Sequence, residues 1–294
     1  MKKLIPNIKE ILEELIFKTF EEADIPFGME LKNIAKWNQT EADWKRFLLY
    51  EPDGCFIAVY NGESAGTVTT INYEKRFGWI GMVLVHPQNR RKGVGTALLR
   101  KAIDYLKSIS VETIKLDATP EGKMVYLRLG FKEEYNLDRR LGIGAVTNCD
   151  EFPPIGINDL QDVISFDTGI FGAKRGKVIE NLLRENPDKN FIAKNHKGHV
   201  EGYIMARKGL NAYQIGPWVS TSASVAEELF ALMLKRLSGE KIFLDVPHVN
   251  ENGLKIIEKH GFTIQRGFTR MFLGSNVYPG EYSLVYATSG AEKG

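Results

Sequence analysis

The stretch "WIGMVLVHPQNRRKGVGTALLR", residues 79–100, decides how the first half of this 294-residue chain is interpreted. Its first seven residues are apolar and predict a buried strand over 79–85, while its end predicts a helix over 94–107. Between them lie three cations, residues 90–92, and two glycines within the next three positions. Glycine lets the backbone approach a ligand closely, and the first N–H groups of a helix attract anions. A strand, a basic glycine turn and a helix in this order favour a pyrophosphate site over a glycine turn with a solvated charge run, although the spacing matches neither the P-loop nor the dinucleotide fingerprint.

The overall composition makes a nucleic-acid partner unlikely for this basic turn. Lys and Arg number 39 against 37 Asp and Glu, which gives a formal net charge of +2. Duplex binding needs a broad excess of cations, so no nucleic acid is expected as a partner. An RNA-binding loop would also need aromatic residues for stacking, and "QNRRKGVG" has none.

The remaining composition is that of an ordinary soluble protein with two domains. Hydrophobic residues make up 43% and charged residues 26% of a chain that is long for a single core. Cys55 and Cys149 have no metal-ligand spacing, so neither a metal nor a disulfide scaffold is expected, and the cytoplasm is the expected compartment. The start, "MKKLIPNIKEILEELIF", carries charges through its apolar part, so neither a signal peptide nor a membrane span is expected.

The second half of the chain repeats the first. "FIAVYNGESAG" at 56–66 matches "FIAKNHKGHVEG" at 191–202, and Gly81 matches Gly216, both at an offset of 135 residues. The offset falls to 128 between Asp117 and Asp245, so the second copy is seven residues shorter in the interval that holds the basic turn. We therefore expect two domains of one α/β architecture, residues 1–143 and 144–294, joined by a linker at 144–154.

In the first domain the residue patterns predict an alternation of strands and helices. Thr40 and Asp43 are spaced as a capping box for the second helix. The expected strands are 15–20, 55–60, 65–73, 79–85, 113–118 and 132–140, and the expected helices are 23–37, 41–50, 94–107 and 123–129.

Two motifs in this order give the chain a family resemblance. Arg90-x-x-Gly93-x-Gly95 after "VLVHP" resembles the acetyl-CoA loop of the GNAT superfamily of N-acetyltransferases, whose motif is R/Q-x-x-G-x-G/A. "VYLRLGF" at 125–131 resembles the second signature of that family, a helix with tyrosine followed by Gly-Phe. The resemblance covers residues 15–141 and implies two fused GNAT-like domains, each with a mixed, mostly antiparallel twisted sheet flanked by helices.

The resemblance also implies the ligands and their residues. Acetyl-CoA is the expected co-substrate, without a metal, and the acceptor is expected to be a small-molecule amine. Tyr126 is expected to protonate the leaving thiolate, which fits an ordinary tyrosine pKa of about 10. Thr119 stands where many members carry asparagine, and it is expected to contact the cofactor arm. The expected cofactor-binding set is Val83, Leu84, Val85, Arg90, Arg91, Lys92, Gly93, Val94, Gly95, Thr96 and Thr119.

The acceptor site and the general base are less specified by the sequence. Asn38 and Gln39 are polar residues that helix packing does not explain, so they are candidates for binding the acceptor. His86 has a suitable pKa for a base, but its position at a strand-to-loop corner also suits a structural role. The carboxylates considered as bases are Glu41, Asp43, Glu74 and Glu121.

The second domain lacks both motifs and is expected to be non-catalytic. Ile257 stands at the position of Tyr126, and Trp218 is expected in the core. Asp167, Lys174 and Arg175 suggest either an anion site for the acceptor or a solvated turn. The main expectation is an N-acetyltransferase that works as a monomer or homodimer. The alternative is a non-catalytic acyl-CoA-binding or regulatory module that keeps the loop but does not depend on Tyr126.

Overall fold

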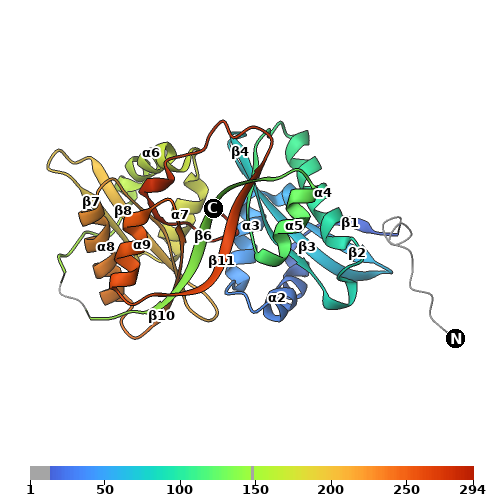
Figure 1. The fold of residues 1–294 in the computed structure, drawn as a ribbon, viewed down its shortest axis with the longest axis horizontal. Helices are drawn as coiled ribbons and strands as arrows, with labels where there is room; N and C mark the ends of the chain where they lie inside the picture. The colour runs from blue at the N-terminus through green and yellow to red at the C-terminus, as the bar shows by residue number, and fades with distance from the viewer. Residues whose placement is uncertain (1–13, 147–148) are drawn as a thin grey trace. The chain divides into compact units, whose positions relative to one another are not determined.

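A computed structural model describes residues 14–146 and 149–294 of the chain, which fold into two compact units (Figure 1). Unit 1 extends to Ile114 and unit 2 begins at Lys115. This division follows spatial contacts, whereas the boundary expected at 143/144 follows the sequence repeat and remains a prediction. We call residues 1–143 and 144–294 the first and second repeat.

Unit 1 is built on an antiparallel sheet in the order β1-β2-β3-β4. The strands are β1 (Ile16–Thr19), β2 (Phe56–Tyr60), β3 (Glu63–Tyr73) and β4 (Phe77–Val85). The helices are α2 (Ile25–Ile34), α3 (Glu41–Tyr50) and α4 (Val94–Ser108), with short 3-10 turns η1 (Glu22–Asp24), η2 (Pro52–Gly54) and η3 (Pro87–Asn89).

The helix boundaries of unit 1 follow from local chemistry. α3 begins at Glu41 with the expected capping box, in which the Asp43 carboxylate accepts the Thr40 N–H at 2.8 Å. The Thr40 hydroxyl also donates to this carboxylate at 3.0 Å. The helix expected at 23–37 is shorter than predicted. It ends at Ile34 because Lys36 takes a left-handed backbone conformation with φ of 55°.

A β-bulge in β4 separates the two halves of the strand. Thr69 pairs with Gly81 and Thr67 pairs with Leu84, so two residues of β4 lie opposite one residue of β3. Met82 has a positive φ of 49°, and the Thr67 hydroxyl donates to its carbonyl at 3.0 Å. The bulge therefore changes the direction of the strand just before the residues expected to contact the cofactor.

Unit 2 contains a sheet in the order β5-β11-β6-β10-β9-β8-β7, with β12 paired to β9. Its strands are β5 (Ile114–Ala118), β6 (Lys132–Ile143), β7 (Asn190–Lys194), β8 (Val200–Lys208), β9 (Tyr213–Ser220), β10 (Lys241–Pro247), β11 (Thr263–Leu273) and β12 (Val285–Ala287). Its helices are α5 (Pro120–Arg128), α6 (Leu160–Phe171), α7 (Gly176–Glu185), α8 (Ala223–Arg236) and α9 (Glu251–Lys259), with 3-10 turns η4 (Ile157–Asp159) and η5 (Tyr282–Leu284). The expected linker, 144–154, contains only isolated bridges at Gly144 and Pro154 among its described residues.

The last strands of the two repeats are exchanged within unit 2. β6, which ends the first repeat, pairs with β10 of the second repeat, and β11 lies between β5 and β6. Figure 1 shows β6 and β11 as two long neighbouring strands. The exchange explains why the compact units do not divide where the repeats meet.

Helices of the second repeat pack on both faces of this sheet. Tyr203 and Ile204 are neighbours in β8, so their side chains point to opposite faces. The Tyr203 hydroxyl contacts Asp167 of α6, while Ile204 packs in one core cluster with Phe230 of α8. Trp218 belongs to the same cluster and stacks on Phe230 with ring centroids 4.6 Å apart, which confirms its expected core position.

Candidate active site

The first turn of α4 in unit 1 has the geometry of an anion site. Gly93 is its N-cap residue in the left-handed conformation, with φ of 85°, and no side chain caps the helix. Arg91 is also left-handed, with φ of 61°, which is uncommon for a residue with a side chain. Among the residues that the structure describes, no side-chain hydrogen bond caps the start of this 15-residue helix, which lies beside a basic turn.

The three cations of the turn differ in their contacts and exposure. The Arg90 Nε donates to the Val85 carbonyl at 3.1 Å, which ties the turn to the end of β4. The Lys92 Nζ lies 5.6 Å from the centre of the Tyr60 ring. Arg90 and Arg91 are exposed, and Lys92 is half-buried, so all three retain access to solvent at the turn.

The corresponding helix of the second repeat has a side-chain cap at its N-terminus. α8 begins after Ser222, whose hydroxyl oxygen accepts the Val225 N–H at 3.4 Å. A serine cap satisfies one of the donors that an anion would otherwise bind. The two repeats therefore differ at this helix in chemistry as well as in loop length.

β4 carries the residues expected to contact the cofactor arm. Val83 and Val85 are half-buried and Leu84 is 6% exposed. Val83 lies in the bulge itself, and Leu84 and Val85 follow it and pair with Thr67 and Gly66 of β3 on one edge of the strand. His86 follows directly: its N–H donates to the Ala65 carbonyl at 2.9 Å, and its Nε2 lies 3.6 Å from Glu30.

Thr119 and Tyr126 lie on α5 in unit 2. Thr119 is the N-cap of α5, and its hydroxyl oxygen accepts the Gly122 N–H at 3.3 Å. This cap starts the helix at Pro120, three residues before the expected position. Tyr126 packs edge-to-face on Phe131 with ring centroids 5.9 Å apart, and burial raises its pKa to about 12. Tyr126 therefore keeps its proton at neutral pH, as an acid must.

The candidates for the acceptor site lie in the connection between α2 and α3. Asn38 and Gln39 are 2% and 4% exposed, and the Gln39 Oε1 has no hydrogen-bond partner among residues 14–146 and 149–294. Lys32 of α2 is also buried, although the sequence did not indicate it as a site residue. Burial lowers the pKa of Lys32, and the negative charge of Asp43 opposes this effect. A lysine within a helix gives no signal of burial in its sequence, because the helix alone does not show what covers it.

Two of the carboxylates considered as bases have structural partners. Asp43 is buried, and its second oxygen accepts from the Arg46 Nη1 at 2.6 Å in addition to the capping box. Glu41 is exposed and pairs with Lys45 at 2.8 Å. Glu74 lies in an exposed turn with φ of 52°, and Glu121 lies in the first turn of α5. None of these contacts identifies a general base.

Of the three residues expected in an anion site or a solvated turn, Asp167 and Arg175 form a buried ion pair with each other, whereas Lys174 is exposed, so the solvated turn is wrong for the first two. Arg175 and Asp167 are 2% and 0% exposed and form two hydrogen bonds of 2.8 Å. The Tyr203 hydroxyl donates to the same carboxylate at 2.5 Å. The hydrophobic surroundings of α6 and α7 cover these groups, and sequence alone does not show that coverage.

Within residues 14–146 and 149–294, no group of three or more His, Cys, Asp or Glu side chains is placed to hold a metal ion. None of the helices described there is long and apolar enough to cross a membrane.

Comparison with known proteins finds both repeats. The model of the acetyltransferase (GNAT) family matches residues 12–131, and the model of the acetyltransferase (GNAT) domain matches residues 163–287. The chain belongs to the GNAT acetyltransferase family. It is an acyltransferase with two GNAT domains, as the two motifs in the first repeat implied, and the family normally uses acetyl-CoA as co-substrate.

Relatives of this GNAT protein are similar over different lengths. Holothin acyltransferase from Pseudoalteromonas sp. (strain SANK 73390) is 27% identical over 88% of this chain and 87% of its own length. An uncharacterized N-acetyltransferase from Methanocaldococcus jannaschii is 33% identical over 41% of this chain and 55% of its own length.

Solved structures share the tandem fold. A putative acetyltransferase from Pyrococcus horikoshii has a TM-score of 0.83 at 24% identity, covering 96% of each chain. A tandem GNAT protein from the clavulanic acid biosynthesis pathway has a TM-score of 0.64 at 14% identity, covering 89% of this chain and 98% of its own. These likenesses confirm the expected fold of two fused GNAT-like domains.

Proposed function

We propose that this GNAT protein transfers the acetyl group of acetyl-CoA to the amine of a small molecule, and that the first repeat binds the cofactor. The observation that carries the proposal is the start of α4, where Gly93 leaves the helix without a side-chain cap beside exposed Arg90 and Arg91. A pyrophosphate would accept hydrogen bonds from these free N–H groups and would be attracted by the cations and the helix dipole.

The proposed contacts are those that the family resemblance implies, residue by residue. The backbone of β4 from the bulge onward, Val83 to Val85, would bind the pantetheine arm. The turn and the first residues of α4, from Arg90 to Thr96, would bind the pyrophosphate. The Thr119 hydroxyl already accepts the Gly122 N–H, and its own hydrogen remains available for donation to the arm.

Tyr126 is proposed as the general acid. Acetyl-CoA supplies the acetyl group and a thiolate leaving group. The new C–N bond forms as the C–S bond breaks, and the Tyr126 hydroxyl gives its proton to the sulfur. The nitrogen releases one proton to solvent, and solvent returns one proton to the Tyr126 phenolate. Burial keeps Tyr126 protonated before transfer, because its pKa is about 12. An alkyl amine must be held neutral to attack, which costs about 4 kcal/mol at neutral pH.

The acceptor is proposed to bind near Asn38 and Gln39. A formal net charge of +2 offers no broad surface field for a polyanionic partner, which supports a small molecule over a nucleic acid. A cytoplasmic monomer or homodimer remains our proposal for the working form.

Calorimetric titration of acetyl-CoA tests the proposed cofactor site. Gly93→Glu would put a carboxylate into the site and strain the left-handed cap, so we expect one site per chain in the wild type and none in this variant. Gly62→Glu is the matched control in the same unit, because Gly62 has φ of 79° and open space around its missing Cβ. Equal binding by Gly93→Glu and the wild type would contradict the proposed site.

Turnover separates catalysis from the alternative of a binding module. A panel of small primary amines with acetyl-CoA should release free thiol in the wild type. Binding of acetyl-CoA without turnover on any amine, with no change in Tyr126→Phe, would favour the non-catalytic module.

A further inference from the structure

The second repeat contains a cleft that is filled by the chain itself. β9 and β10 pair in parallel from Tyr213 to Ile215, and their pairing ends there. β9 then passes through a bulge at Gly216 and continues to Ser220. On the edge that β10 has left, β12 pairs antiparallel with β9, with Val285 opposite Val219 and Ala287 opposite Trp218.

The covered edge matches the edge of β4 that we assign to pantetheine. The offset of 135 residues that relates Gly81 to Gly216 relates Val83 to Trp218 and Leu84 to Val219. Both strands also bulge here, between Gly81 and Leu84 in β4 and between Ile215 and Trp218 in β9, and matching the bulges relates Leu84 to Trp218 and Val85 to Val219. Either alignment places Trp218 and Val219 opposite residues from Val83 to Val85. The strand residues that β12 covers are therefore the counterparts of proposed cofactor-binding residues.

The segment also bonds to the other side of the opening. The Thr288 N–H donates to the Asp245 carbonyl of β10 at 2.9 Å, and the Asn250 side-chain amide donates to the Val285 carbonyl at 3.0 Å. Tyr286 is 2% exposed and packs on Trp218 with ring centroids 4.9 Å apart. The segment thus uses main-chain bonds to both diverging strands and a buried aromatic anchor.

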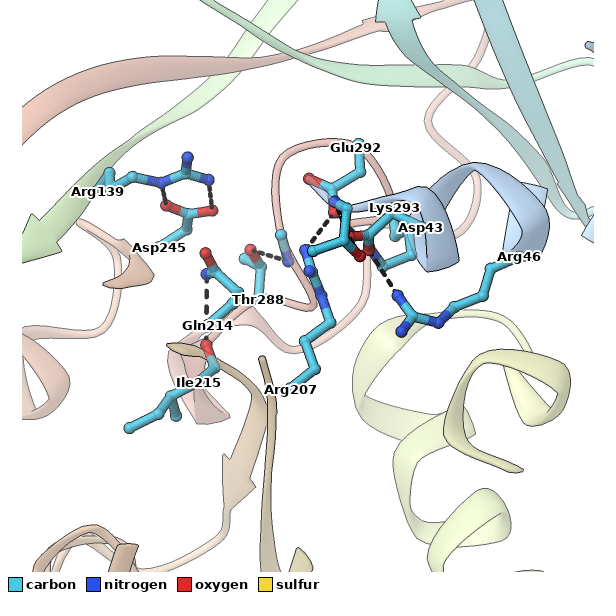
Figure 2. Close-up of polar contacts among 12 residues, drawn as sticks. Asp43, Arg46, Arg139, Arg207, Gln214, Ile215, Asp245, Thr288, Glu292 and Lys293 are labelled. Atoms are coloured by element: carbon cyan, nitrogen blue, oxygen red, sulfur yellow. Dashed lines mark hydrogen bonds and ion pairs between the residues drawn. The ribbon is translucent and has the colours of Figure 1, made fainter. Parts of the chain in front are cut away.

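Charged groups hold the end of the segment. Figure 2 shows Arg207 directed at Glu292, and the Nη2 lies 2.8 Å from the carboxylate. Both side chains are buried, Lys293 contacts the same carboxylate, and the Arg175 Nη1 donates to the Gly294 carbonyl at 2.8 Å. Close approach also requires Gly216, because a Cβ there would lie 1.8 Å from the Thr288 carbonyl oxygen.

We propose that the second repeat retains a peptide-binding cleft at the position of its lost pantetheine site, and that its ligand is the chain's own segment 285–294. The segment bonds to the edge of β9 in place of a cofactor arm, while Ser222 closes the helix that would hold the pyrophosphate. The chain therefore binds one acetyl-CoA, not two. The comparison with pantetheine rests on the proposed function of the first repeat, whereas the occupancy of the cleft does not.

Hydrogen exchange of the full chain with an Asn250→Asp variant tests the proposal. Aspartate keeps the oxygen that accepts the Gly253 N–H at 2.8 Å and so preserves the cap of α9, but it replaces the donor to Val285 with a repelling oxygen. We expect exchange at 285–288 and at Trp218 and Val219 to rise roughly tenfold together, with β6 unchanged. Asn195→Asp is the matched control, because the Asn195 Oδ1 accepts the Lys197 and His199 N–H groups and a carboxylate retains that role.

A second variant and a stoichiometry measurement complete the test. If Asn250→Asp raises exchange throughout unit 2, the Glu292→Gln variant is used instead. It leaves the cap of α9 intact and weakens only the contact between residue 292 and Arg207. Wild-type exchange at 285–288 as fast as in a free peptide, or full protection in both variants, would overturn the proposal. Two bound acetyl-CoA per wild-type chain would overturn it as well. No bound acetyl-CoA would overturn the proposed function instead, and the exchange result would still decide whether the segment occupies the cleft.

Discussion

Burial controls the protonation of two side chains in unit 2 in opposite directions. Tyr126 packs on Phe131, and burial raises its pKa to about 12. Lys115 is fully buried among Glu134, Tyr278 and Tyr282, and burial lowers its pKa to about 8 despite the carboxylate. In both cases the uncharged form is favoured because charge is costly away from water.

Tyr126→Phe tests the acid role. We expect kcat to fall by about 10²- to 10⁴-fold, with the Kd for acetyl-CoA within about twofold of wild type, because only proton transfer is lost. Steady-state kinetics and calorimetry measure the two effects. In the wild type, kcat should not decline between pH 7 and 10 through loss of this proton, since the pKa of Tyr126 is about 12. A decline with an apparent pKa below 10 that disappears in Tyr126→Phe would contradict the pKa assigned to this group.

The lowered pKa of Lys115 predicts that the free energy of unfolding depends on pH. Between about pH 8 and 10.5 the unfolded lysine binds a proton that the folded one has lost, so the free energy of unfolding rises with pH across this window. The rise should reach about 3 kcal/mol, and it should be absent in Lys115→Met. Urea unfolding of both proteins at several pH values measures it, with Lys255→Met, on an exposed lysine, as the control. Parallel curves for the wild type and Lys115→Met would refute the assignment.

The exchanged strands are held by two reciprocal ion pairs. Arg139 of β6 donates two hydrogen bonds of 2.7 Å to Asp245 of β10. Arg270 of β11 donates to Asp117 of β5 at 2.8 and 2.9 Å. Asp117 and Asp245 are counterparts in the repeat, so each repeat supplies the arginine that neutralises the buried aspartate of the other. The two pairs therefore favour β10 as the partner of β6, and they place β11 beside β5.

Breaking one of these pairs should cost more than replacing it. Arg139→Met leaves Asp245 buried without its partner, and we expect the free energy of unfolding to fall by about 3–5 kcal/mol. The double variant Arg139→Met, Asp245→Leu removes both charges and should recover much of that loss. Chemical denaturation measures both. If the double variant were as unstable as Arg139→Met, the loss in free energy of unfolding would not come from the unpaired charge of Asp245.

The elements themselves were largely predictable from residue patterns. The glycine turn, the capping box at Thr40 and the apolar run before residue 86 define α4, α3 and β4 close to their expected limits. The early end of α2 was not predictable, because the left-handed conformation of Lys36 has no marker in the sequence. The pairing of β6 with β10 was also not predictable, because strand partners are chosen by long-range contacts.

For the whole molecule, the proposed site predicts ligand-dependent stability. Acetyl-CoA at about 100 times its Kd should add about 2.7 kcal/mol to the free energy of unfolding. This corresponds to a rise in Tm of about 5 °C for a protein of this size. Thermal unfolding with and without acetyl-CoA measures the shift, which Gly93→Glu should abolish and Gly62→Glu should retain. A shift that survives in Gly93→Glu would place the ligand elsewhere.

The sequence by itself determined the family, the internal repeat and the repeat that carries the basic glycine turn, because these depend on local spacing of glycine, charge and apolar residues. Only the tertiary structure decided that the last strands are exchanged, that Asp167 and Arg175 form a buried pair, and that segment 285–294 covers the edge of β9. Each of these depends on which distant segments exclude water from a given group. Periodicity along the chain reports which face of an element is apolar, but it does not report which other segment covers that face.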